Sequence, residues 1–241
     1  MWCKEEQSRT AMLLGEDAMQ KLERARVAVF GVGGVGGHLC EALARAGVGA
    51  IDLFDNDCVS LSNINRQIVA LHSTVGRPKT EVMKERILDI NPDCRVAVHS
   101  VFYLPQNADE YPLDCYDYIA DAIDTVSAKI ELAVRADQAG IPIIAAMGAG
   151  NRTDPCRFSV TDLFRTEGCP LARVMRRELR ARGIKKLRVV FSDEPAATPI
   201  AKMLLKEGED MPKKRPPASL SFVPSAMGLI MAQQIVMDLI Q

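Results

Sequence analysis

Residues 26–37 read Arg-Val-Ala-Val-Phe-Gly-Val-Gly-Gly-Val-Gly-Gly, a short apolar run that leads into a turn rich in glycine. The run at 27–30 has the continuous hydrophobic character of a strand that is buried on both faces of a parallel sheet. Glycines let the following turn bend sharply and let its backbone approach a phosphate without a Cβ in the way. These glycines are Gly31, Gly33, Gly34 and Gly36. A helix predicted over 38–46 would direct its free N–H groups at the same anion.

Predicted strands and helices alternate beyond this turn at the spacing of βαβ units. The expected strands lie at 49–54, 95–100, 116–122 and 141–147, and the expected helices at 78–90 and 128–139. This alternation predicts a doubly wound, Rossmann-like, mainly parallel α/β sheet with a C-terminal extension. We expect a helical lead-in over 1–25, a nucleotide-binding core over 26–150 and an extension over 151–241. The extension should contain strands at 157–162 and 187–191, helices at 171–182 and 224–240, and a loop at 192–217.

The composition fits a globular intracellular protein. The chain has 241 residues, of which 48% are hydrophobic, and a formal net charge of −1; these values suit one α/β domain with its own core. Its polar start does not resemble a signal peptide, and no apolar run reaches the roughly 20 residues that span a bilayer. Seven cysteines without a C-x-x-C pair argue against a zinc ribbon. We expect a cytoplasmic protein with reduced thiols and no integral membrane segment.

Three polar residues behind the turn indicate which nucleotide the site takes. Asp55 ends the second strand, where a carboxylate can accept hydrogen bonds from ribose hydroxyls, but this placement is common to NAD and ATP sites. Arg66 offers a planar fork for phosphate oxygens and Lys79 a compact point charge. Taken singly, each cation is typical of a solvated surface. Together they suit a triphosphate attacked at its α-phosphorus, because negative charge builds up on the departing pyrophosphate. They favour ATP over a hydride-transfer cofactor.

An aspartate after the fourth strand is the candidate metal ligand. Asp124 lies at the edge where the carboxyl ends of a parallel sheet form the ligand crevice. Mg²⁺ prefers one or two carboxylates together with phosphate oxygens, so we assign Asp124 to Mg²⁺ bound with ATP. The neighbouring Asp121 is an alternative, and either aspartate is also a candidate cap for the helix that begins near Ser127.

Five spaced motifs carry a family resemblance. They are the glycine turn, Asp55, Ser62-Asn63-Ile64-Asn65-Arg66-Gln67, Gly76-Arg77-Pro78-Lys79 and Asp124. Together they resemble the ThiF/MoeB/HesA superfamily, the bacterial relatives of ubiquitin-activating enzymes. The resemblance implies one ThiF-type adenylating domain over 1–241, with catalysis by Arg66, Lys79 and Asp124. It implies that ATP is held by Gly31, Gly33, Gly34, Gly36, Asp55, Asp57, Asn63, Arg66, Gln67, Lys79 and Asp124.

The amino-terminal segment carries a further point of resemblance. Arg9, in Ser8-Arg9-Thr10, resembles the arginine with which members of this superfamily reach into the nucleotide site of the partner subunit. The resemblance therefore implies a homodimer and adds Arg9 to the catalytic residues. Sulfur-relay proteins are further candidate partners for this class of enzyme, although no residue of the sequence identifies one.

Other segments narrow the resemblance to the tRNA threonylcarbamoyladenosine dehydratases, the TcdA/CsdL branch. They are 45–49, 65–68, 83–87, 148–150, 154–155 and 160–163. Members of this branch activate the carboxylate of N6-threonylcarbamoyladenosine in tRNA with ATP. The acyl group then closes on itself and AMP leaves, so the net reaction is a dehydration. The branch lacks the paired zinc cysteines of its sulfur-carrier-activating cousins, and so does this chain. The alternative is adenylation of the C-terminal Gly-Gly of a small sulfur-carrier protein.

A basic segment after the predicted sheet is the candidate tRNA contact. Eight cations between 173 and 188 accompany a single acid, Glu178. They suit an RNA backbone or the solvated face of an amphipathic helix, and we favour RNA. The candidates are Arg173, Arg176, Arg177, Arg180, Lys185 and Lys186, with Lys213, Lys214 and Arg215 as a second group. Aromatic content of 5% argues against a stacking platform, so we expect the target base in an exposed anticodon loop.

Three other interpretations stay open. Cys169 precedes a proline helix start close to Arg165 and Arg173, a setting that can lower the pKa of a thiol. A dehydratase needs no thioester there, so we favour an ordinary thiol. An NAD-linked oxidoreductase would leave the cations behind the glycine turn without a role. A non-catalytic nucleotide-binding scaffold predicts that Arg66→Ala changes no activity.

Overall fold

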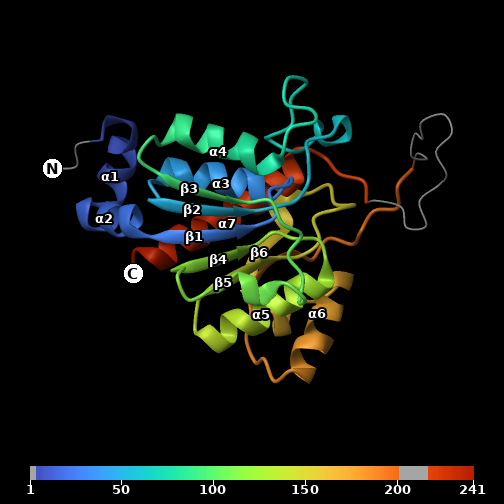
Figure 1. Cartoon of the computed structure of the whole chain (residues 1–241). Coiled ribbons are helices and arrows are strands. Elements are labelled where there is room, and N and C mark those ends of the chain that lie inside the picture. Colours follow the sequence, from blue (N-terminus) through green and yellow to red (C-terminus); the bar gives the residue numbers. More distant parts are fainter. Residues whose placement is uncertain (1–3, 201–216) are drawn as a thin grey trace.

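A seven-stranded sheet forms the centre of the computed structural model, which describes residues 4–200 and 217–241 (Figure 1). The strand order is β3-β2-β1-β4-β5-β7-β6, and every pairing is parallel except that of β6 with β7. The strands are β1 (Arg26–Phe30), β2 (Ala50–Phe54), β3 (Arg95–His99), β4 (Tyr118–Asp121), β5 (Ile143–Ala146), β6 (Phe158–Asp162) and β7 (Arg188–Ser192). The strand order reverses its direction between β1 and β4, as in a doubly wound fold. The predicted Rossmann-like, mainly parallel α/β architecture is confirmed.

Helices cover both faces of this sheet. α3 (Gly36–Ala46), α4 (Lys79–Ile90) and α7 (Phe222–Leu239) lie on one face, and α5 (Val126–Ala139) and α6 (Pro170–Ala181) on the other (Figure 1). In the lead-in, α1 (Ser8–Leu14) and α2 (Glu16–Arg24) are separated by Gly15, whose φ is 86°. Because a positive φ ends a helix, the lead-in is two helices. Short 3-10 turns lie at Glu5–Gln7, Leu61–Asn63, Ala108–Glu110, Pro155–Arg157 and Leu163–Arg165.

Alternate residues of β1 enter cores on opposite faces of the sheet. Val27 and Val29 are buried in the cluster that includes residues of α3 and α7. Ala28 and Phe30 are buried in the cluster that includes residues of α5. A strand buried on both faces has no solvated side, which explains why the sequence of β1 is almost continuously apolar. Its central place puts the glycine turn in the middle of the carboxyl edge of the sheet.

Helix α7 is remote in sequence from the glycine turn but packs on α3, the helix that follows the turn. At Gly228 a Cβ would lie 2.3 Å from the carbonyl oxygen of Val35, so only glycine permits the close crossing. Val223, Met227 and Met231 of α7 are buried. Among the described residues, α7 is the one helix whose length and hydropathy would also suit a membrane span. Its buried side, which includes these three residues, packs against the protein, whereas Leu229 and Met237 are exposed.

The extension departs most from the sequence-based expectation. The two strands predicted there are present, but β7 inserts between β5 and β6. β6 therefore becomes an antiparallel edge strand. Strand propensity cannot specify this order, because it depends on pairing between segments distant in sequence. Of the predicted loop 192–217, most residues lie outside the described part of the chain, including Lys213, Lys214 and Arg215.

Candidate functional site

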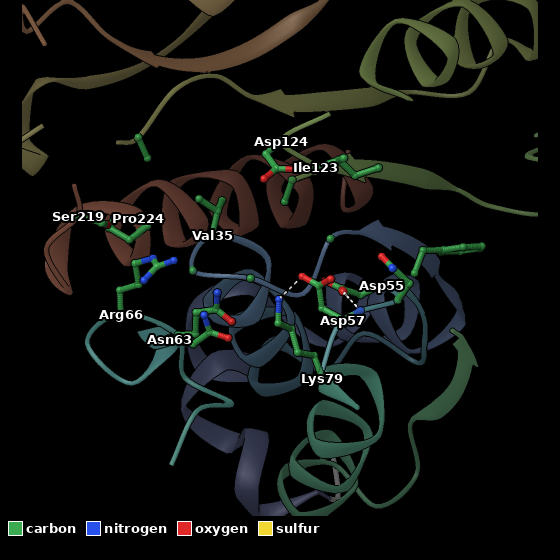
Figure 2. A pocket seen from close by; sticks show the side chains of 18 of the residues that line it. Val35, Asp55, Asp57, Asn63, Arg66, Lys79, Ile123, Asp124, Ser219 and Pro224 are labelled. Carbon is green, nitrogen blue, oxygen red and sulfur yellow. Dashed lines mark hydrogen bonds and ion pairs between the residues drawn. The ribbon is translucent and has the colours of Figure 1, made fainter. Parts of the chain in front are cut away.

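The carboxyl ends of β1, β2 and β4 border a cavity of about 600 Å³ (Figure 2). Open α/β sheets form their ligand crevices where the strand order reverses, as it does here between β1 and β4. The residues predicted from the sequence that line this cavity are Gly31, Gly33, Gly34, Asp55, Asp57, Asn63, Arg66, Gln67, Lys79 and Asp124. Gly36 lies behind them as the first residue of α3. The fold thus brings together side chains from several separate segments.

The glycine turn is too compact for side chains at two of its positions. Gly31 has a φ of 91°, and a Cβ there would lie 2.7 Å from the carbonyl oxygen of Ala122, which follows β4. At Gly36 a Cβ would lie 1.8 Å from the carbonyl oxygen of Gly31. Helix α3 begins here without a side-chain cap. The amide of Gly37 already donates to the carbonyl of Gly33 at 3.0 Å, so the amides of Gly36 and His38 are the ones in its first turn that stay available for an anion. The turn has the shape and polarity of a phosphate cradle.

The carboxylate of Asp55 ties this turn to the end of β2. Its Oδ2 accepts a hydrogen bond from the amide of Val32 at 2.7 Å, and its Oδ1 accepts one from the amide of Asp57 at 2.8 Å. The amide of Asp55 donates to the carbonyl of His99 at the end of β3, at 3.2 Å. Each carboxylate oxygen has a second lone pair, so Asp55 retains acceptor capacity for the hydroxyls of a ribose.

Lys79 places a buried cation beside the cavity. It is the first residue of α4 and is 5% exposed, and its Nζ forms an ion pair with Asp57 Oδ2 at 2.7 Å (Figure 2). The side chain of Asp57 is 60% exposed, so water can solvate this carboxylate without its partner. A buried ammonium needs a nearby anion to remain charged. A phosphate in the cavity could take that place from Asp57.

Arg66 is held by its own loop and keeps donors for a ligand. Its Nη1 donates to the carbonyl of Ser62 at 2.9 Å and to Asn65 Oδ1 at 2.8 Å. Asn63 shapes the same loop through a capping box. Within the described residues, Nε and Nη2 of Arg66 have no hydrogen-bond partner. Gln67 is buried, and its Oε1 also has no hydrogen-bond partner among the described residues. A buried oxygen of this kind is a candidate acceptor for a ligand or for water.

The structure separates the two neighbouring aspartates that the sequence left as alternatives. Asp121 forms an ion pair of 2.9 Å with Lys129, and both side chains are fully buried. Burial raises the pKa of Asp121, and the ammonium of Lys129 opposes that rise. Asp124 is exposed on the cavity wall, where its Oδ1 accepts a long hydrogen bond of 3.4 Å from Thr125. Asp124 is therefore the aspartate that can meet a ligand.

Several cavity residues were not predicted from the sequence. They include Phe54, Val101, Phe102, Tyr103 and Ile123 near the strand ends, Ala149 at the end of the core, and Pro217, Ser219 and Pro224 from the extension. The segment after β3 could have been found, because it follows a parallel strand at the ligand edge. Phe102 is 48% exposed, so one aromatic ring is open at the cavity even though the composition argued against a stacking platform. Residues 217–224 reach the cavity by tertiary packing and carry no local signal.

Arg9 lies away from the nucleotide cavity of its own chain. It lines a separate groove of about 450 Å³ between α1, α3 and α7. No residue of α1 is buried, and its Met12 and Leu13 are 87% and 85% exposed. Exposed apolar side chains gathered along a groove are typical of a protein interface.

The basic segment is less uniform than its sequence suggests. Arg176 turns inward and donates to the carbonyl of Thr166 at 2.7 Å, and Arg188 forms an ion pair with Asp238. Arg177 pairs with Glu178 at 2.7 Å. Arg180 lies 5.5 Å from the ring centre of Phe164. The exposed cations of the segment with no ion-pair partner among the described residues are Arg173, Arg180, Lys185 and Lys186.

Cys169 is shielded from solvent. It is 2% exposed at the N-cap of α6. Its neighbours in the core include Ala172 and Met175. These surroundings agree with an ordinary packed thiol, the interpretation that the sequence favoured, and offer a substrate no access.

Known proteins resemble this chain over almost its whole length. The ThiF family model matches residues 7–241. A tRNA threonylcarbamoyladenosine dehydratase of Bacillus subtilis is 45% identical over 239 residues, which are 97% of this chain and 94% of that protein. The crystal structure of E. coli tRNA N6-threonylcarbamoyladenosine dehydratase, TcdA, in complex with ATP is similar with a TM-score of 0.85 and 37% identity, covering 97% of this chain and 94% of that one.

A relative named for sulfur-carrier adenylation matches a smaller part of this chain. A sulfur carrier protein adenylyltransferase of Thermus thermophilus is 34% identical over 148 residues, which are 59% of this chain and 54% of that protein. The family match, in contrast, includes the glycine turn, the segment that carries Arg66, and the whole extension. The resemblance drawn from the five motifs is confirmed, and the chain belongs to the ThiF family.

Proposed function

We propose that the protein carries out the ATP-dependent dehydration of N6-threonylcarbamoyladenosine in tRNA by adenylating its carboxylate. The observation that carries this proposal is the convergence of the glycine turn, Arg66, Lys79 and Asp124 on one cavity. Relatives named for this activity match 97% of the chain. A relative named for sulfur-carrier adenylation matches 59%, so the adenylation of a carrier Gly-Gly terminus has less support.

In this proposal ATP lies in the cavity with its ribose at Asp55 and its phosphates at the glycine turn. The start of α3, which has no side-chain cap, would face the phosphates with the amides of Gly36 and His38 and with the positive end of the helix dipole. Lys79 exchanges its contact with Asp57 for a phosphate oxygen. Arg66 offers Nε and Nη2 as a fork. Both cations stabilise the negative charge that develops on the pyrophosphate as it leaves.

Mg²⁺ is the metal that fits Asp124. One exposed carboxylate beside a triphosphate supplies the donor set that Mg²⁺ prefers, namely few protein oxygens together with phosphate oxygens and water. Asp121 does not fit, because its charge is committed to Lys129. When bound, the ion would offset the repulsion between the carboxylate of Asp124 and the phosphates.

The reaction requires no covalent nucleophile from the protein. The substrate carboxylate attacks the α-phosphorus of ATP and pyrophosphate leaves. A carbamoyl oxygen of the same molecule then attacks the acyl carbon, AMP departs, and a carbamoyl nitrogen loses its proton. The net change is the loss of one water. Because the second attack is intramolecular, it gains a large effective molarity, and a buried Cys169 is no obstacle.

The proposal includes a homodimer. The groove that contains Arg9 is lined by Leu13, Leu229 and Met237, which are exposed apolar residues of α1 and α7. A second copy would cover these side chains. Since Arg9 does not reach the cavity of its own chain, it would act at the site of the partner subunit.

We also propose where the tRNA binds and where the enzyme acts. The tRNA would contact Arg173, Arg180, Lys185 and Lys186, and would present the modified base from its anticodon loop. The chain would act as one adenylating domain in the cytoplasm, with 151–241 as its RNA-facing part. The continuous sheet through β7 and β6 supports one domain. Nothing in the described residues identifies a sulfur-relay partner.

Mass analysis of tRNA nucleosides tests this function. Purified protein is incubated with tRNA that carries the modification, ATP and Mg²⁺, and the nucleoside should become lighter by one water while AMP accumulates in equal amount. Without tRNA, AMP should not form. Pyrophosphate exchange that depends on a Gly-Gly carrier and not on tRNA would support the alternative. Absence of both activities in a folded protein would overturn the proposal.

A further inference from the structure

A series of hydrogen bonds connects Asn151 to Arg66. The Oδ1 of Asn151 accepts from the amide of Ala218 at 2.8 Å. The carbonyl of the next residue, Ser219, accepts from Asn65 Nδ2 at 3.1 Å. Asn65 Oδ1 in turn accepts from Arg66 Nη1 at 2.8 Å. Arg66 and Ser219 line the nucleotide cavity, whereas Asn151, Ala218 and Asn65 stand outside its lining. The two asparagines thus support a wall that the ligand touches.

Asn151 occupies a demanding backbone position. Its φ of 57° is the one positive φ of a non-glycine residue among the described residues. Its amide donates to the carbonyl of Ala218 at 2.8 Å, and its carbonyl accepts from the amide of Ala197 at 2.7 Å. Asn151 therefore holds the chain on both sides of 198–217. Residues kept in this sparsely populated region concentrate at functional sites.

The supported wall lies at the Arg66 end of the cavity. Figure 2 shows Ser219 and Pro224 near Arg66, with Asp55 on the other side of the view. If the ribose lies at Asp55, the Arg66 end takes the terminal phosphates. An arginine side chain has many rotamers, so an anchored guanidinium loses less freedom when it binds them. Asn65 supplies part of that anchor and is itself fixed by Ser219.

We infer that Asn151 is a positioning residue that, through Ala218, Ser219 and Asn65, orients Arg66 toward the terminal phosphates of ATP. This inference rests on the proposed function, because it takes ATP as the ligand. It assigns Asn151 no contact with substrate. Its effect should therefore be specific to ligands that reach Arg66, and it should disappear when Arg66 is replaced.

Two substitutions at Asn151 form a matched pair. Asn151→Gly removes Oδ1, and glycine adopts a φ near 57° without strain, so the backbone hydrogen bonds can persist. Asn151→Asp retains an oxygen acceptor and also tolerates this conformation. Calorimetric titration with ATP and with AMP should give an ATP dissociation constant raised about fivefold in Asn151→Gly, the effect of one lost hydrogen bond. AMP affinity should be unchanged, and Asn151→Asp should bind ATP like the wild type.

The Arg66→Ala variant tests whether Asn151 acts through Arg66. There, Asn151→Gly should cause no further loss of ATP affinity, because coupled residues are not additive. Hydrogen exchange at the Ala218 amide of the free protein should be faster in Asn151→Gly and unchanged in Asn151→Asp. Equal weakening of ATP and AMP, or the same ATP loss with and without Arg66, would overturn the inference. So would wild-type ATP affinity in Asn151→Gly. If the wild-type protein binds ATP but releases no AMP in the presence of tRNA, that result overturns the proposed function and leaves this inference standing.

Discussion

Asp121 and Lys129 form an ion pair of 2.9 Å in which both side chains are fully buried. The pair also fixes the backbone of Ile123, which lies between these two side chains and the cavity. Lys129 Nζ donates to the carbonyl of Ile123 at 3.2 Å, and Asp121 Oδ1 accepts from the amide of the same residue at 3.2 Å. Neither charge meets the cavity, yet together they fix the turn that carries Asp124.

Breaking this pair should cost stability, whereas removing both charges should not. Asp121→Asn is expected to lower the free energy of unfolding by about 3–5 kcal/mol, because it leaves the ammonium of Lys129 buried without a counter-charge. The double change Asp121→Leu with Lys129→Met should recover most of that loss, since apolar side chains avoid the cost of burying charge. Denaturant unfolding gives the free energy of unfolding of the wild type, of Asp121→Asn and of the double variant. Wild-type stability in Asp121→Asn would contradict this account.

The glycine turn can be tested with two glycines that share a positive φ. Gly31 and Gly76 have φ values of 91° and 89°, but a Cβ at Gly31 would meet Ala122, whereas a Cβ at Gly76 would have open space. Gly76→Ala should therefore cost only the backbone strain, roughly 1 kcal/mol, and leave ATP affinity intact. Gly31→Ala should displace the turn and reduce ATP affinity at least about tenfold. Titration calorimetry and thermal unfolding separate the two effects. Equal ATP affinities of Gly31→Ala and Gly76→Ala would refute the role of the glycine turn in holding the phosphates.

Lys79 should contribute to catalysis more than to folding. Lys79→Met fills the same space without a charge, and the carboxylate of Asp57 that it leaves is exposed. We expect tRNA-dependent AMP release to fall by roughly 10²–10³-fold, the usual effect of removing a group that stabilises developing negative charge, with little change in melting temperature. Lys84→Met, on the same helix but outside the cavity lining, is the control and should be near wild type. Similar rates for both variants would remove Lys79 from the mechanism.

A second buried carboxylate predicts a pH dependence of stability. Burial by itself raises the pKa of Asp52, but hydrogen bonds from Arg26, His99 and Tyr116 outweigh it, so the pKa lies below its ordinary value. The resulting stabilisation is complete above the unfolded-state pKa of about 3.9 and is lost as the pH falls through the lower folded-state pKa. Asp52→Asn should reduce the free energy of unfolding at pH 7 by about 3 kcal/mol and flatten its decline below about pH 4.

The control for this titration is an exposed carboxylate. Asp109 pairs with Arg135 but its side chain is 94% exposed, and exposed ion pairs contribute at most about 1 kcal/mol. Asp109→Asn should therefore keep the acid dependence of the wild type. Urea unfolding between pH 2 and pH 7 provides the measurement. An acid limb that is equally steep in Asp52→Asn would show that other carboxylates govern it.

The proposed homodimer depends on the exposed apolar residues of α1. Leu13→Asp would bury a charge in the interface, and we expect a monomer that has lost most AMP release, because Arg9 could no longer reach a partner. Leu71→Asp replaces another exposed leucine, 54% exposed, and should leave the dimer and its activity intact. Analytical ultracentrifugation gives the assembly state. An active monomer of either the wild type or Leu13→Asp would rule out the shared site.

Local patterns in the sequence predicted the core of the site, because the residues concerned lie within or next to regular elements. The strand before Gly31, the helix after it and the acid at Asp55 all follow from periodicity and turn chemistry. The choice between Asp121 and Asp124 could not be made in this way. Asp121 pairs with Phe30 and Ala145 in the middle of the sheet, and only this placement reveals its burial.

The basic segment shows the same limit at longer range. Counting charges gave eight cations, but Arg188 is paired with Asp238 of α7, fifty positions later in the sequence. Arg176 is likewise turned toward Thr166. Helical spacing predicts which residues share a face, but it does not reveal which of them find a distant partner. The same applies to Ser219 and Pro224, which reach the cavity because α7 packs on α3.

The contact between α7 and the glycine turn has a consequence for biosynthesis. A Cβ at Gly34 would lie 3.3 Å from the ring of Pro224, so residues made early and late by the ribosome share one wall. A nascent chain cannot pair β1 before β2 and β4 have emerged, since a domain generally folds as a unit. It cannot close the cavity before α7 appears. Chains that terminate before α7 would expose the apolar residues of α3 that α7 covers, and such exposed surface favours aggregation.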